Sequence, residues 1–254
     1  MVSISEAQLA AWLSPIFWPF LRVMGMFGVA PIFSLRSIPV RVKVALAFLV
    51  ALSAQATLVG QPVVSINGPQ ALGAVVQNVG VGMALGFAVR LVFVAVELAG
   101  ELVGLQMGLN FASFFDPTSG GQVSAVSRFM GHMSVLLFVV INGHLMLLMA
   151  VVRSFRAFPV DGSFLQSMAS LQLHRLGSEL FASAFWIALP MVGLLLFTNL
   201  ALGVISRVAP QMNIYSIGFP ITLSVGMAGI AATLPLMDQP VLALMERVVA
   251  LFGS

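Results

Sequence analysis

The longest apolar stretch of the chain is ALGAVVQNVGVGMALGFAVRLVFVAVELAGELVGLQMGLNF, residues 71–111. It holds neither a proline nor a turn-forming pair, so one continuous helix is the simplest prediction. Such a helix would be roughly 60 Å long, about twice the thickness of a hydrocarbon core. The alternative is a helical hairpin that turns near Glu97, although the surrounding residues carry no turn signal.

The distribution of basic residues bears on this choice. Arg36, Arg41 and Lys43 form the densest positive cluster and are expected on the cytoplasmic side. A hairpin would then place Arg153 and Arg156 on that side too, whereas one long helix would place them opposite. The two criteria disagree. We favour a long helix that does not obey ordinary bilayer limits.

Composition excludes most classes of soluble protein. The 254 residues include only 11 Lys or Arg and 8 Asp or Glu, and 60% of the chain is hydrophobic. A soluble domain carries about 25% charged residues, whereas this chain has 7%. The high sequence pI of about 10.6 reflects a surplus of three charges, and no basic run suggests nucleic-acid binding. The chain is therefore expected to be an integral membrane protein.

Six apolar runs approach or exceed the length of about 20 residues that a membrane-spanning helix needs. Their residues show no period-two alternation, which favours helices over a β-barrel and predicts an all-α fold. No domain boundary is visible, so one bundle over residues 1–254 is expected. The runs are 8–33, 44–59, 71–112, 129–152, 180–205 and 213–235.

Glycines recur at four-residue spacing along the long apolar stretch, at Gly100, Gly104 and Gly108 and again at Gly82 and Gly86. Small residues at this spacing let helix backbones approach closely in a membrane. The stripe predicts a helix-packing seam. Packing within the chain and packing against a partner subunit are equally compatible with it.

Charged residues inside the same stretch predict a buried charge network of Arg90, Glu97 and Glu101, which share one helical stripe. A structural network is favoured over a proton relay, which would need a further partner. The histidines lack metal-site spacing and no nucleophile motif occurs, so no catalytic, metal or cofactor site is predicted.

The segment GLQMGLNFASFFDPTSGGQ, residues 104–122, overlaps the end of the long apolar stretch and continues beyond it. It combines three phenylalanines with an Asp-Pro turn and a glycine pair. A bulky apolar loop at membrane depth either packs beneath its own bundle or lines a water-filled cavity, where it can gate a pore by excluding water. The residues concerned are Phe111, Phe114, Phe115, Asp116, Pro117, Gly120 and Gly121.

Three stretches carry a resemblance that covers essentially the whole chain. They are APIFSLRSIPVRVKVALA (30–47), the segment 104–122, and LGVISRVAPQMNIYSIGFPITLSVG (202–226), whose PQMN-centred motif is the most specific. The chain resembles the FliR family of type III secretion export-gate proteins, of which the injectisome members are of the SctT type. The matching family-motif positions are Pro31, Pro39, Lys43, Gln106, Arg207, Pro210, Gln211, Asn213, Gly218 and Pro220.

The resemblance implies a fold and a role. It implies a FliP-like part, approximately residues 1–175, and a FliQ-like part, approximately 176–254, with long hairpin-like helices. Such a subunit would join several copies of FliP and FliQ in a helical assembly at the flagellar basal body in the bacterial inner membrane. Unfolded flagellar substrates would pass through its pore. The loop from Phe111 to Gln122 would form a plug, with Phe111, Phe114 and Phe115 at its centre.

The resemblance further implies that FlhB associates with this core, that FlhA lies beside it, and that the subunit is not an enzyme. Membrane lipid is a further expected partner, although much of the assembly would be lifted out of the ordinary bilayer plane. A stand-alone secondary transporter or ion channel is the alternative. It would require inverted halves and polar residues that converge at the midplane. A faint echo between residues 30–39 and 209–220 is its only support. A membrane scaffold without a conduit is a third possibility.

Overall fold

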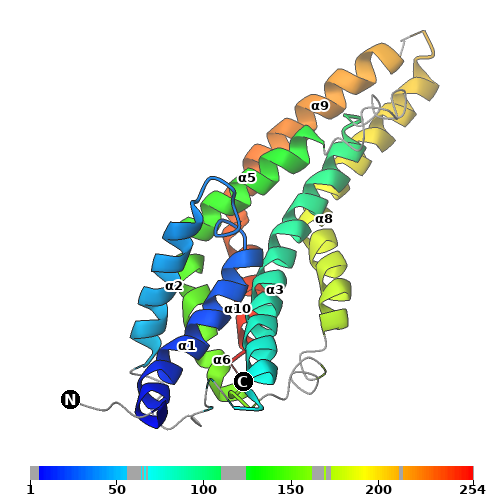
Figure 1. Ribbon diagram of the computed structural model, residues 1–254. Helices are drawn as coiled ribbons and strands as arrows, with labels where there is room; N and C mark the ends of the chain where they lie inside the picture. The colour runs from blue at the N-terminus through cyan, green and yellow to red at the C-terminus, as the bar shows by residue number, and fades with distance from the viewer. Residues whose placement is uncertain are drawn as a thin grey trace, which may run out of the picture. The chain divides into compact units, whose positions relative to one another are not determined.

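The structure is a computed structural model that describes residues 6–55, 64, 66, 68–109, 124–161, 169, 173–211 and 214–253. Within these ranges every regular element is helical, which confirms the all-α prediction (Figure 1). The elements are α1 (Glu6–Val29), α2 (Val40–Gln55), α3 (Ala71–Gln106), α5 (Ala125–Val140), α6 (Gly143–Ala157), α8 (Leu173–Val208), α9 (Ile214–Thr233), the 3-10 helix η2 (Leu234–Leu236) and α10 (Asp238–Ala250).

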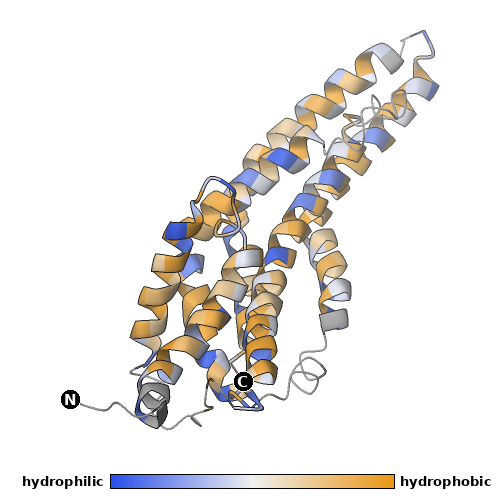
Figure 2. Cartoon of the chain, viewed as in Figure 1, coloured by the Kyte–Doolittle hydropathy of each residue, from blue (hydrophilic) through white to orange (hydrophobic). Residues whose placement is uncertain are grey.

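Four of the described helices are long and apolar enough to span a membrane: α1, α3, α8 and the helix that begins with α9. Apolar residues cover most of their length (Figure 2). Within the described structure, 61% of the candidate membrane span of α3 is buried, compared with only 28% of that of α8. Helix α8 therefore presents a largely apolar surface, as a helix in contact with lipid or other subunits does.

Helix α3 is one unbroken element of 36 residues (Figure 1), so the continuous helix is confirmed and the hairpin near Glu97 is wrong. At 1.5 Å per residue it is about 54 Å long. The physical reason is local: the segment holds no proline, and its residues form backbone hydrogen bonds along the entire helix.

The apolar run 129–152 is not one helix. It contains the junction of α5, which ends at Val140, and α6, which begins at Gly143. Asn142 stands at the break with φ of 56° and is followed by Gly143. An Asn-Gly pair favours a turn because both residues tolerate the left-handed region. The prediction of one apolar run over 129–152 does not include this turn signal.

Contacts between Cα atoms divide the chain into two compact units. The first unit comprises residues 1–91, 142–177 and 245–254, and the second comprises 92–141 and 178–244. The predicted FliP-like and FliQ-like parts concern likeness to other subunits, and the boundary near residue 175 stays a prediction.

Glycines bring α1 and the first part of α3 into backbone contact within the first unit. A Cβ atom added at Gly82 would meet the carbonyl oxygen of Arg22, and one at Gly86 would lie 2.8 Å from that of Met26. From the other side, Gly25 faces the backbone of Val79. The stripe of Gly82 and Gly86 is therefore a packing seam inside the chain.

The second unit packs α3 against α5 and α8 against α9. The rings of Phe93 and Phe138 meet edge to face, with centroids 5.3 Å apart. Gly229 of α9 leaves room for the Met191 side chain, whose sulfur would be 2.8 Å from an added Cβ atom. A flexible thioether fills such irregular space well.

Candidate functional site

The predicted loop begins where α3 ends, and a helix-terminating motif fixes that end. Gly108 has φ of 78°, a left-handed conformation that glycine adopts without steric cost. The Leu109 amide donates to the carbonyl oxygen of Gly104 at 3.1 Å, and the Gly108 amide donates to that of Leu105 at 3.0 Å. This pair of bonds is a Schellman motif. Gly108 thus terminates α3. Its contribution to the predicted helix-packing seam stays a prediction.

The same end of α3 is anchored on α9. The side chain of Met107 is fully buried, and its Cγ and Sδ atoms would lie 2.6 Å from a Cβ atom at Gly226. Glycine is therefore the residue that leaves space for the methionine. This contact holds the last turn of α3 in a defined position immediately before residues 110–123.

After those residues the described chain resumes at Ser124, which is tied back to α3. The Ser124 amide donates to Oε2 of Glu101 at 3.1 Å, and its side chain caps α5 by accepting from the Ser127 amide at 3.1 Å. The Ser127 hydroxyl donates to the carbonyl oxygen of Glu97 at 2.7 Å. Both ends of the segment 110–123 are therefore attached to neighbouring turns of α3. We call these attachments, at Glu97–Leu109 and Ser124–Ser127, the loop stem.

Close glycine packing supports the loop stem. A Cβ atom at Gly100 would lie 2.7 Å from Cα of Ser127, so α5 rests directly on the α3 backbone there. Gly131 of α5 leaves space for the Glu97 side chain. Gly104 is buried. Gly100 therefore packs within the chain, and a contact of this seam with a partner subunit stays a prediction.

The predicted plug residues lie outside the described residues, and their placement stays a prediction. They are Phe111, Phe114, Phe115, Asp116, Pro117, Gly120 and Gly121.

The structure describes all three residues of the charged stripe. In the single chain, the side chains of Arg90 and Glu97 are exposed, whereas Glu101 is half-buried. Glu101 accepts a backbone hydrogen bond in the loop stem. A buried charge network of these three residues stays a prediction.

A buried polar cluster around Arg22 in the first unit was not predicted from the sequence. Its guanidinium donates to Oδ1 of Asn78 at 3.1 Å, to Oγ of Ser154 at 3.0 Å and to the carbonyl oxygen of Phe158 at 2.7 Å. The same group lies 3.6 Å from the centroid of the Phe155 ring. Arg22 is fully buried, and these described partners are neutral. An arginine within an apolar run is a signal for such a cluster.

The family-motif residues are spread over the described helices. Pro31 lies in the turn after α1, and the Pro39 carbonyl accepts the amides of Val42 and Lys43 at the start of α2. The Lys43 ammonium donates to the Leu35 carbonyl oxygen at 3.2 Å. The remaining positions are Gln106 at the end of α3, Arg207, Pro210 and Gln211 at the exposed end of α8, and Gly218 and Pro220 in α9, while Asn213 lies outside the described residues.

The fold and the loop stem define an all-α integral membrane protein with an overlong helix that ends in a fixed loop attachment. Residues 13–248 match the family described as bacterial export proteins, family 1. The chain is 43% identical to the flagellar biosynthetic protein FliR of Escherichia coli (strain K12), over 93% of this chain and 90% of that protein. It is 40% identical to FliR of Pectobacterium carotovorum subsp. carotovorum, with the same coverage, and 29% identical to FliR of Bacillus subtilis (strain 168), over 81% and 80%.

The chain therefore belongs to the FliR family of bacterial export proteins. It is a membrane component of the flagellar export apparatus.

Proposed function

We propose that this chain is a non-enzymatic core subunit of the flagellar type III export gate. It forms with FliP and FliQ the pore for unfolded flagellar substrates, and the segment Phe111–Gln122 is the plug of that pore. FlhB and FlhA associate with the core, which lies in the inner membrane at the basal body. The observation that carries this proposal is the loop stem, which fixes the residues on both sides of the segment 110–123 beside the 36-residue helix α3 of a FliR-family protein.

The physical logic of the plug is a seal with fixed ends. Phe111, Phe114 and Phe115 offer apolar rings that exclude water and ions from a narrow passage. In this proposal the Asp-Pro pair favours a turn, and the Gly-Gly pair supplies the backbone freedom that a moving loop needs. The loop stem supplies the fixed point against which the loop closes.

The apolar surface of the second unit supports an assembly. Phe181, Trp186 and Phe197 of α8 are 58%, 76% and 70% exposed in the single chain. Large aromatic side chains are enriched where subunits pack together. A helix with these side chains is suited to contact FliP and FliQ as well as lipid.

The test is ion leakage through the inner membrane of cells that carry the whole apparatus. Replacing Phe114 and Phe115 with Ala, or deleting 113–121, is expected to raise leakage, because the apolar seal is lost. The control is Phe87→Ala, which removes the same kind of ring from a partly exposed position of α3 outside the predicted plug and should leave leakage unchanged. Leakage and motility at the wild-type values in both plug variants would show that the assignment is wrong.

Co-purification in mild detergent separates this proposal from a stand-alone transporter or channel. A stable particle that contains FliP and FliQ is expected. A monomer or dimer with neither partner would favour the transporter instead.

A further inference from the structure

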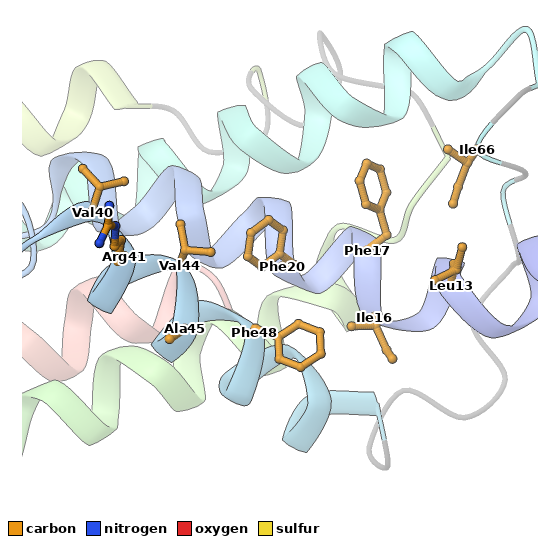
Figure 3. Close-up of a pocket in the computed structure, with 10 residues that line it drawn as sticks. All are labelled: Leu13, Ile16, Phe17, Phe20, Val40, Arg41, Val44, Ala45, Phe48 and Ile66. Atoms are coloured by element: carbon orange, nitrogen blue, oxygen red, sulfur yellow. The ribbon is translucent and has the colours of Figure 1, made fainter.

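Helices α1 and α2 of the first unit border a groove of about 890 Å³ (Figure 3). Its walls are apolar and include Phe17 and Phe20 from α1 and Val44, Ala45 and Phe48 from α2. The volume lies within the range of about 300–1,000 Å³ that is common for ligand sites. A ligand with a long apolar part fits these walls.

One end of the groove is apolar and held in place. Leu13 and Ile66 lie at this end (Figure 3). The connector that carries Ile66 is attached to α1, since the Val64 carbonyl oxygen accepts hydrogen bonds from Oγ of Ser14 at 3.1 Å and Nε1 of Trp18 at 3.3 Å. Two hydrogen bonds therefore hold the apolar end of the groove in place.

The opposite end is basic. Arg41 lies there beside Val40 (Figure 3), and among the described residues it is the charged side chain that lines the groove. Arg41 is exposed in the first turn of α2, where the partial positive charge of the helix dipole adds to its own charge. Arg36 and Lys43 flank it in the sequence, and Lys43 is bound to the preceding turn.

The positive charge at this end has no acidic residue near it in the sequence. No Asp or Glu occurs between Glu6 and Glu97, so the basic cluster has no acidic neighbour in that part of the sequence. An apolar groove with a basic end is complementary to an amphiphile that has an anionic head. We propose that the groove binds one anionic phospholipid, with an acyl chain along Phe17, Phe20 and Phe48 and the phosphate at Arg41.

The proposal is tested by native mass spectrometry of the full chain, released from mixed micelles of phosphatidylglycerol and phosphatidylcholine with identical acyl chains in equal amounts. The wild type is expected to retain phosphatidylglycerol with a preference of about fivefold, the factor that one basic side chain near an anionic headgroup supplies. Arg41→Gln should lower this preference to about one, whereas Arg41→Lys should keep most of it.

Two further variants control for the groove and for the charge. Ala45→Phe fills the groove and should reduce the retention of both lipids, while Arg128→Gln removes an exposed arginine of the other unit and should behave as the wild type. Circular dichroism and gel filtration confirm that each variant is folded. Equal retention of the two lipids by the wild type, unchanged preference in Arg41→Gln, or undiminished lipid in Ala45→Phe would overturn the proposal and favour a protein segment as the occupant.

Discussion

Replacing Glu101 with Ala tests the loop stem directly, because the Glu101 carboxylate accepts the amide hydrogen of Ser124 at 3.1 Å. A hydrogen bond to a charged acceptor contributes about 1.5–3 kcal/mol, and the half-buried position favours the lower end of that range. A loss of ~1.5 kcal/mol shifts a local opening equilibrium by about tenfold. We therefore expect the Ser124 amide to exchange its hydrogen about ten times faster in Glu101→Ala.

Hydrogen exchange followed by mass spectrometry of the peptide that contains Ser124 gives this rate in the intact complex. Glu101→Gln retains an oxygen acceptor and should produce a smaller rise. Glu97→Gln is the matched control, since the backbone oxygen of Glu97, rather than its carboxylate, accepts from Ser127. If Glu101→Ala and Glu97→Gln exchange at the same rate with equal amounts of folded protein, the carboxylate does not hold the stem.

Two further predictions concern the first unit, and each is read from the midpoint of thermal unfolding in detergent. Arg22→Met should destabilise the protein by at least ~3 kcal/mol because it leaves buried hydrogen-bond acceptors unpaired. Arg128→Met, at an exposed arginine, should change the midpoint little, and equal midpoints for the two variants would refute the structural role of Arg22. Gly82→Ala should lower the free energy of unfolding by about 1–3 kcal/mol because the added Cβ atom meets the Arg22 carbonyl. Gly28→Ala is the control, since its Cβ atom meets no atom within 4 Å, and a Gly82→Ala variant as stable as the wild type would contradict the close contact of α1 and α3.

Local properties of the sequence predicted the features that local chemistry determines. The continuous helix over 71–106 follows from apolar residues without a proline, a condition that each turn satisfies separately. The break at Asn142–Gly143 was equally local, but the apolar run on both sides concealed it. Composition predicted the membrane class because an excess of apolar side chains is independent of their arrangement.

Features that depend on distant residues were beyond the sequence. The partners of Arg22 lie 56 and 132 residues away, at Asn78 and Ser154, so the run around Arg22 gave no sign of what neutral groups surround it. Gly108 follows Gly104 at the spacing of a packing stripe, yet its left-handed φ comes from the end of the helix. That end is fixed where Met107 meets Gly226, a contact made by another helix.

The residues that attach the segment 110–123 to α3 differ from those proposed to seal the pore. Its hydrogen bonds at the α3 end and at Ser124 involve main-chain atoms on the loop side, so they do not depend on which side chains the intervening loop carries. In the proposed plug, the aromatic side chains at 111, 114 and 115 would then serve the seal alone. From this separation we infer that stem variants change the position of the loop, whereas loop variants change only the tightness of the seal. Exchange at Ser124 should accordingly rise in Glu101→Ala and remain unchanged when Phe114 and Phe115 are replaced.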